Sequence, residues 1–175
     1  MSWHRYIRPA LAAGIALAAA GCLRPLYGPT ASGVPLQEAL ASISVENVTT
    51  PLGQERLGHY LRSELIFDLD GSGQVSRKKY RLTLDASESV QVTTTDTVTG
   101  RADAALLNVT VKYVLLSNDG SRPIGSGTAR TTATYFRDPQ RFANVRAARD
   151  AEIRASKLIA DDIKQRLAAL FATSP

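Results

Sequence analysis

The sequence is poor in the residue types on which many enzymes and metal sites depend. Its 175 residues include one cysteine and two histidines, and aromatic residues make up only 6%. A single cysteine excludes an internal disulfide, and two histidines with one cysteine cannot complete a zinc site by themselves. Hydrophobic residues still reach 44% and charged residues 21%. These values are ordinary for a globular domain, so the chain can build a buried core without disulfides.

Long apolar runs are also missing, except for one short stretch near the amino terminus. Residues 1–21 begin with Arg5 and Arg8 and no acidic residue, and continue into the uncharged stretch PALAAGIALAAAG. As a helix, the apolar part spans about 18 Å, less than the roughly 30 Å of a bilayer core. It is too short for a permanent membrane span. This pattern predicts a lipoprotein signal peptide at residues 1–21.

The single cysteine, Cys22, directly follows this apolar stretch. Ala-Ala-Gly before a cysteine resembles the lipobox of bacterial lipoproteins, although Ala19 stands where leucine is usual. The resemblance implies cleavage before Cys22, a diacylglycerol on its thiol and an acyl group such as palmitate on its new amine. Several acyl chains give a near-permanent membrane anchor. The alternative interpretation is an idle cysteine in an exported protein.

Composition divides the rest of the chain into a tether and one domain. Residues 22–42 hold the lipidated N-terminus and a stretch rich in proline and glycine, from Leu23 to Pro35, which cannot form regular structure. Residues 43–175 carry strand and helix patterns and form a single α/β domain. No later segment is long and uncharged enough to cross a bilayer as a helix.

Periodicity within this domain predicts four strands and two helices. Alternating apolar and polar residues give strands at 43–48, 80–94, 102–117 and 126–138. The predicted inward faces of the second and third strands hold Leu82, Leu84, Ala86, Val90 and Val92, and Leu107, Val109, Val111, Tyr113 and Leu115. Apolar residues at helical spacing give one helix with Thr50 as its N-cap, ending near Gly71, and a second from Pro139 to Phe171 with Asp138 as N-cap. The apolar stripe of the first helix includes Leu57, Leu61 and Leu65. The second helix has an apolar seam of Ile153, Ala160, Ile163, Leu167 and Leu170, and Asp162 can pair with Arg166 at i, i+4. The second helix is about 50 Å long, so we expect its first turns to project past the sheet.

The order of these elements predicts the fold class. A helix between two strands makes them parallel through a right-handed crossover, whereas short turns make the later strands antiparallel. The predicted fold is α+β, in the order β-α-β-β-β-α. Two helices pack on one face of a four-stranded mixed sheet.

Few motifs in the domain offer catalytic or metal chemistry. His59 lies on an amphipathic helix without a second histidine nearby, so a surface histidine is the simpler interpretation. The stretch DLDGSG resembles the start of a calcium loop that begins at Asp68 and Asp70. However, Lys79 stands at position twelve, where the loop requires a bidentate glutamate. We therefore predict no metal site, no cofactor beyond the covalent lipid and no enzymatic activity.

Arginine is concentrated between residues 122 and 149. This stretch holds six arginines, no lysine and one acidic residue, Asp138, which gives a net charge of +5. The whole chain after residue 21 carries only +3, from 19 basic and 16 acidic residues. A guanidinium holds phosphate through paired hydrogen bonds. A solvated helix face explains this stretch as readily as a phosphate-binding surface does. Export makes a phosphorylated lipid a better candidate than nucleic acid.

These motifs together resemble the LptE family of lipopolysaccharide-assembly lipoproteins, in its alphaproteobacterial branch. The specific parts are Cys22 followed by LRPLYG, and YFRDPQRFANVRAARDAE leading into the last helix. The resemblance implies an outer-membrane lipoprotein, lipid-anchored on the periplasmic side. Such a protein acts as plug and assembly partner of the LptD β-barrel and assists lipopolysaccharide transport to the cell surface. The residues nearest to the family's lipopolysaccharide contacts are Arg101, Arg141, Arg146 and Arg149.

Two other functions remain open at this point. A small tethered α/β lipoprotein also suits an auxiliary subunit of a phospholipid-trafficking ABC transporter, which would associate with an inner-membrane permease. An envelope hydrolase would require serine or aspartate groups that the sequence does not bring together. Association with a large outer-membrane barrel separates the first alternative from the LptE resemblance.

The lipidation of Cys22 gives a first testable prediction. Cys22→Ser removes the thiol that accepts diacylglycerol, so we expect a chain that carries no lipid and keeps its signal peptide. The measurement is the intact mass of the protein recovered from membranes, with the wild-type chain as the reference. A wild-type mass without acyl chains, or a Cys22→Ser protein that still carries them, would contradict the prediction.

Overall fold

The computed structural model describes residue 30 and residues 33–71, 77–95, 102–120, 122–137 and 140–173. The predicted signal peptide, Cys22, Arg101 and the expected N-cap Asp138 lie outside these residues. The elements, in chain order, are α2 (Leu36–Ala41), β1 (Ile43–Val45), α3 (Glu55–Asp70), β2 (Tyr80–Thr95), β3 (Ala102–Ser117), β4 (Pro123–Phe136) and α4 (Arg141–Thr173).

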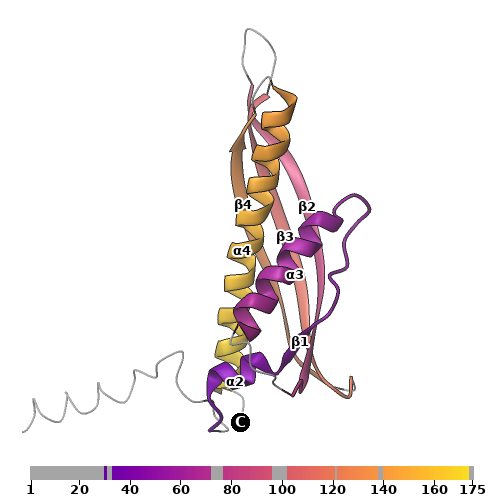
Figure 1. Cartoon of the computed structure of the whole chain (residues 1–175), viewed down its shortest axis with the longest axis vertical. Coiled ribbons are helices and arrows are strands. Elements are labelled where there is room, and N and C mark those ends of the chain that lie inside the picture. Colours follow the sequence, from indigo (N-terminus) through magenta and orange to yellow (C-terminus); the bar gives the residue numbers. More distant parts are fainter. Residues whose placement is uncertain are drawn as a thin grey trace, which may run out of the picture.

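The four strands form one mixed sheet in the order β1-β2-β3-β4. β1 pairs with β2 in parallel, and the two remaining pairs are antiparallel. Helices α3 and α4 lie on one face of the sheet, as Figure 1 shows. The predicted α+β class and the order of the strands are confirmed. The short helix α2 is an addition that the sequence did not predict.

Helix α4 matches the sheet in length. The three long strands have 14 to 16 residues, or about 50 Å at 3.3 Å per residue. Helix α4 has 33 residues, also about 50 Å, and it runs along the sheet in Figure 1. The expectation that its first turns project past the sheet was therefore wrong, because it assumed short strands. None of the helices in the described part of the chain is long and apolar enough to span a membrane.

The helix-covered face of the sheet forms the core. On β3, all five residues predicted to point inward are buried: Leu107, Val109, Val111, Tyr113 and Leu115. On β2, Leu82, Leu84 and Ala86 are buried as predicted, but Val90 and Val92 are 55% and 45% exposed. Apolar and polar residues continue to alternate along β2, but no helix covers the apolar side chains of Val90 and Val92.

The late start of α3 explains this exposure. We expected Thr50 to be its N-cap, but the helix begins at Glu55 after Gln54. Residues before Gln54 still follow the edge of β2: Thr49 donates its N–H to the carbonyl of Leu84 at 2.9 Å and accepts from the N–H of Ala86 at 2.9 Å. The chain turns into a helix only after this edge contact ends. Consequently α3 packs against β1 and the first half of β2.

Small residues allow α4 to lie close to the sheet. On β4 the residues that face α4 include Gly125, Gly127, Ala129 and Ala133. A Cβ at Gly125 would stand 2.8 Å from Leu170 of α4, so only glycine fits there without a shift. On the helix, the buried residues include Ala151, Ala155, Ser156, Ala160 and Ala168. Ile153, which we expected in this seam, is 39% exposed because the buried stripe passes through its smaller neighbours.

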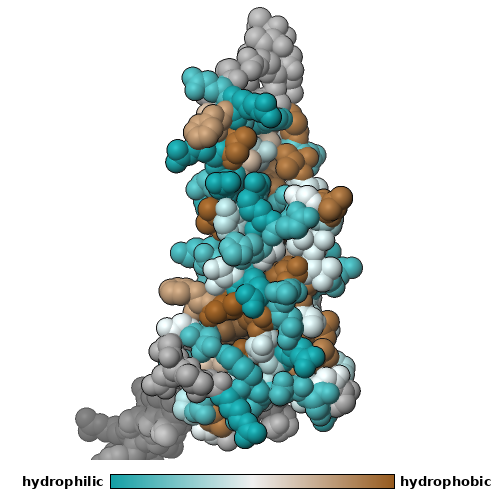
Figure 2. Space-filling view, turned by 45° about the vertical axis from the view of Figure 1, so that its right-hand side comes forward, coloured by the Kyte–Doolittle hydropathy of each residue, from teal (hydrophilic) through white to brown (hydrophobic). Residues whose placement is uncertain are grey.

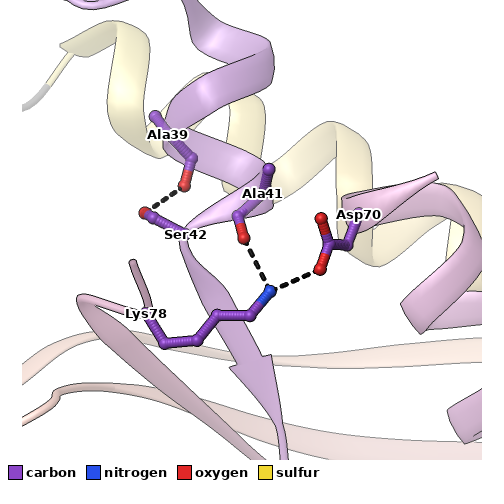
Figure 3. A network of polar contacts seen from close by, with 5 residues as sticks. All are labelled: Ala39, Ala41, Ser42, Asp70 and Lys78. Atoms are coloured by element: carbon purple, nitrogen blue, oxygen red, sulfur yellow. Dashed lines mark hydrogen bonds and ion pairs between the residues drawn. The ribbon is translucent and has the colours of Figure 1, made fainter. Parts of the chain in front are cut away.

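A polar network fastens α2 to the base of the domain (Figure 3). The ammonium of Lys78, just before β2, donates to the carbonyl of Ala41 at 2.7 Å and to Asp70 Oδ2 at 2.6 Å. The hydroxyl of Ser42 donates to the carbonyl of Ala39 at 2.6 Å. Lys78 thus joins the end of α2, the end of α3 and the start of β2. This base is the end of the domain from which the chain leads back towards Cys22.

Candidate functional site

Three of the four predicted lipopolysaccharide contacts lie together in the first turns of α4. Arg141, Arg146 and Arg149 are all exposed. These turns lie at the end of the molecule opposite to α2, because α4 runs from the tip of β4 back to the base (Figure 1). We call the exposed residues of these turns the distal arginine surface: Arg141, Phe142, Val145, Arg146 and Arg149. Arg101 and the lipidation residue Cys22 lie outside the described residues.

The distal arginine surface is apolar as well as basic. Phe142 is 73% exposed and Val145 is 49% exposed. Val145 and Arg146 lie three and four residues after Phe142, and Arg149 lies four and three residues after them, so the four side chains share one side of the helix. The guanidinium carbon of Arg146 lies 5.9 Å from the centre of the Phe142 ring, within the range of a cation–π contact. Both kinds of side chain therefore face solvent in one stripe.

No carboxylate within the described residues forms an ion pair with Arg141, Arg146 or Arg149. By contrast, Arg154 and Arg166 further along α4 pair with Asp150 and Asp162 at 2.8 Å. The predicted i, i+4 pair of Asp162 and Arg166 is thus confirmed. The first arginines of α4 keep their charge available for an external anion. Phe142 and Val145 beside them suit the apolar part of an amphiphile.

The arginine-rich stretch of the sequence does not form one surface. Arg137 follows the end of β4 and is near the start of α4 in the chain. Arg122 precedes β4 at the other end of the molecule, and Arg130 lies midway along β4 on the face without helices. The sequence alone grouped these residues by position in the chain, whereas the strand β4 separates them in space.

A second polar group lies where α3, α4 and β2 meet. Arg56, in the first turn of α3, makes a bidentate ion pair with Glu152 of α4. Glu152 is only 4% exposed. The hydrogen bond that Arg56 donates to Glu152 is the main cause of the raised pKa of Arg56. Glu88 of β2 lies close enough for its pKa to be affected by both groups. Burial is the main cause of its raised pKa, followed by the charge of Glu152, while Arg56 acts in the opposite direction.

The residues that resembled a calcium loop are engaged by lysines. Asp70 forms an ion pair with Lys78, and Oδ1 of Asp68 lies 3.8 Å from Nζ of Lys164. Burial is the main cause of the raised pKa of Asp68. His59 is exposed on α3 beside Tyr60, as the simpler interpretation predicted. The described residues contain no group of three or more His, Cys, Asp or Glu placed to hold a metal ion. The absence of a metal or cofactor in the working protein stays a prediction.

Two hollows lie outside the distal arginine surface. One, of about 350 Å³, is at the base between α2, the end of α3 and Lys164 of α4. The other has a volume of about 300 Å³ and lies between the segment Thr49–Pro51 and the strands β2 and β3. The strands contribute Asp85, Ser87, Thr110 and Lys112 to its lining. Neither hollow gathers more than one carboxylate, so neither suggests acid–base catalysis by paired carboxylates.

Sequence reasoning found the arginines of the distal surface but missed its apolar part. The signal was present, since Phe142 and Val145 alternate with arginines at helical spacing before the buried stripe begins at Ala151. Their exposure was not predictable, because it depends on where along α4 the buried contact with the sheet begins. The Arg56–Glu152 pair was also missed, since its members are 96 residues apart.

Comparison with known proteins links the chain to one family. Residues 40–167 match the family model described as "LptE: Lipopolysaccharide-assembly". A putative lipoprotein from Caulobacter crescentus is similar over 79% of this chain and 97% of that one, at 24% identity and a TM-score of 0.61. Lipoprotein B from Nitrosomonas europaea is similar over 76% and 89%, at 17% identity and a TM-score of 0.51. These structural likenesses show a shared fold. No curated protein sequence matches the chain.

The raised pKa of Glu88 predicts how stability depends on pH. A carboxyl whose pKa is higher in the folded than in the unfolded chain favours folding below its unfolded pKa. That contribution is lost as the pH rises through the folded pKa. Glu88→Gln leaves a side chain that does not ionise, so the stability that wild type loses on ionisation of Glu88 is kept. We therefore expect a higher melting temperature than wild type near neutral pH. The plot of melting temperature against pH should also be flatter above about pH 4, the range in which glutamate titrates.

The measurement is thermal unfolding followed by circular dichroism at a series of pH values. Glu38→Gln is the matched control, because Glu38 is exposed on α2 and its neutralisation leaves the Arg56 group intact. A Glu88→Gln variant with the same pH profile as wild type would contradict the argument.

Proposed function

The chain belongs to the LptE lipopolysaccharide-assembly family, and on this premise we propose that it is an outer-membrane lipoprotein, anchored through acylated Cys22. In this proposal the domain acts as plug and assembly partner of an LptD-type β-barrel and assists the transport of lipopolysaccharide to the cell surface. It works by binding and shape, without a catalytic step.

The distal arginine surface is the observation that carries the lipopolysaccharide part of the proposal. Lipopolysaccharide combines phosphates with acyl chains, and this surface combines Arg141, Arg146 and Arg149 with exposed Phe142 and Val145. Paired hydrogen bonds from guanidinium suit the phosphates. The apolar side chains gain free energy when an acyl chain covers them. Figure 2 shows hydrophobic and hydrophilic side chains mixed on the upper part of the molecule.

The face of the sheet without helices supports the barrel part of the proposal. Its hydroxyl and amide side chains include Ser87, Ser89, Asn108, Thr110, Thr128, Thr132 and Thr134, while Leu106, Val114 and Leu116 of β3 add apolar groups to the same face. Charge on this face is limited to a few residues, including Asp85, Lys112 and Arg130. The interior of a large outer-membrane barrel is polar and wet. The hydroxyl and amide groups on this face suit such a lumen, because they can exchange hydrogen bonds with water.

The shape of the domain is consistent with an anchored plug. The described chain begins near α2 at the base, and the distal arginine surface lies about 50 Å away along α4. A lipid anchor before the base therefore leaves the arginines at the far end of the rod. They are free to meet a ligand inside the barrel.

Recovery of the barrel tests the proposal as a whole. The full-length lipoprotein, tagged at its carboxyl end, is purified from detergent-solubilised outer membranes, and its partners are identified by mass. We expect an LptD-type barrel in stoichiometric amount. Recovery of an inner-membrane permease without a barrel would instead support the transporter-accessory function, and recovery of neither would refute the assembly role.

Charge reversal tests the distal arginine surface separately. The double variant Arg146→Glu/Arg149→Glu should bind purified lipopolysaccharide about tenfold more weakly or worse, because charge-assisted hydrogen bonds to phosphate are among the stronger polar contacts. The double variant Arg122→Glu/Arg130→Glu changes net charge equally but lies away from the surface, so it is the matched control. Circular dichroism verifies folding of both. Equal weakening in the two variants would show that only overall charge matters.

A further inference from the structure

The two edges of the sheet are treated differently, and the difference points to a binding site. On β4, two arginines of α4 occupy the edge: Arg154 donates to the carbonyl of Thr134 at 3.1 Å, and Arg166 donates to that of Thr128 at 3.2 Å. Proteins commonly block exposed edges in such ways, because free backbone groups invite another strand. The β4 edge is thus blocked at two positions.

The lower half of the β2 edge is occupied by the chain itself. Glu46 donates its N–H to the carbonyl of Leu82 at 3.0 Å, and Thr49 pairs with Leu84 and Ala86. The amide side chain of Gln54 then imitates a strand residue. It donates to the carbonyl of Glu88 at 3.0 Å and accepts from the N–H of Glu88 at 2.8 Å.

Beyond Glu88 the described residues leave the β2 edge open. Backbone groups that face this edge belong to alternate residues, from Leu82 to Glu88, so those of Val90 and Val92 face it as well. No described residue contributes a hydrogen bond to these groups. In Figure 1 the upper part of β2 stands clear of α3. The side chains of Val90 and Val92 are half exposed on the helix side of the sheet.

The side of α4 that carries Glu152 also carries positive charge closer to the distal end. Helix α4 packs on β3 and β4, while α3 covers the lower part of β2. Glu152 of α4 reaches towards β2 through its pair with Arg56. Arg149 and Val145 lie three and seven residues before Glu152, on the same side of the helix. They therefore lie one and two turns closer to the distal end than Glu152, on the side of α4 that faces the space above Arg56.

We propose that the edge of β2 at Val90–Val92 is a strand-addition site for an extended segment of the barrel partner, with apolar side chains opposite the valines and an acidic side chain opposite Arg149. Backbone donors and acceptors in a strand edge are best satisfied by another extended backbone. A second copy pairing through the same edge would bring two Arg149 side chains together, so the charge favours a foreign, acidic segment. The ownership of the segment rests on the proposed function.

Replacement by proline tests the edge directly. Val92→Pro removes an edge-facing N–H that β2 does not need for pairing with β3, and proline is tolerated at strand edges. We expect about tenfold less barrel to be recovered with the full-length lipoprotein. Thr132→Pro makes the equivalent change on the edge of β4 and should recover the barrel as wild type does. Val92→Lys is a second variant, since lysine opposes strand addition without altering the backbone.

Amide hydrogen exchange of the purified complex gives an independent readout. The N–H groups of Val90 and Val92 should exchange at least tenfold more slowly in the complex than in the free lipoprotein. Thermal unfolding of each free variant verifies that loss of barrel does not reflect loss of fold.

The outcomes separate this proposal from the proposed function. Equal recovery of the barrel with Val92→Pro, Val92→Lys and wild type, with unchanged exchange at both amides, overturns the strand-addition site and leaves the assembly role standing. If the wild-type protein recovers no barrel, the assembly role fails and the proposal fails with it. Protection of the two amides in the free lipoprotein that increases with its concentration would identify a second copy as the occupant and also overturn the proposal.

Discussion

The close packing of α4 on β3 and β4 is the contact on which the rest of the structure depends. Small residues are buried on both elements, Gly125 of β4 lies against Leu170 of α4, and the helix therefore approaches the sheet closely from Ala151 onward. Because a sheet with one uncovered face needs a long partner on its other face, this helix keeps three strands of about 50 Å in one layer. The position of every functional candidate follows from it.

Partial cover by the helix layer creates the surfaces that are available for binding. Helix α3 begins late because the chain before Gln54 is still bound to the edge of β2. Its late start leaves Val90 and Val92 without a helix above them, and it places Arg56 beside Glu152 and Glu88. The first turns of α4 lie beyond the buried stripe that begins at Ala151, so arginine and phenylalanine remain exposed there. Exposure at the distal end thus follows from the late start of the buried stripe on α4, and exposure of Val90 and Val92 follows from the late start of α3.

Much of the fold could be predicted because its signals are local. The alternation of Leu107 to Leu115 predicted a buried face of β3 that the structure confirms, and the spacing of Leu57, Leu61 and Leu65 predicted the buried stripe of α3. The same rule failed at Val90 and Val92, since alternation identifies a face of a strand but not whether anything covers it. The N-cap assigned to Thr50 failed because a long-range hydrogen bond to β2 outweighed a local helix signal.

The sequence by itself determined the strand order, the two long helices, the parallel first pair, the family and the arginine-rich start of α4, since each of these depends on neighbouring residues or on short motifs. Only the tertiary structure decided which arginines share a surface, which edge of the sheet is blocked by Arg154 and Arg166, and which valines stay exposed. Those properties depend on contacts between residues far apart in the chain. The local pattern of a sequence does not contain the distances in space between such residues.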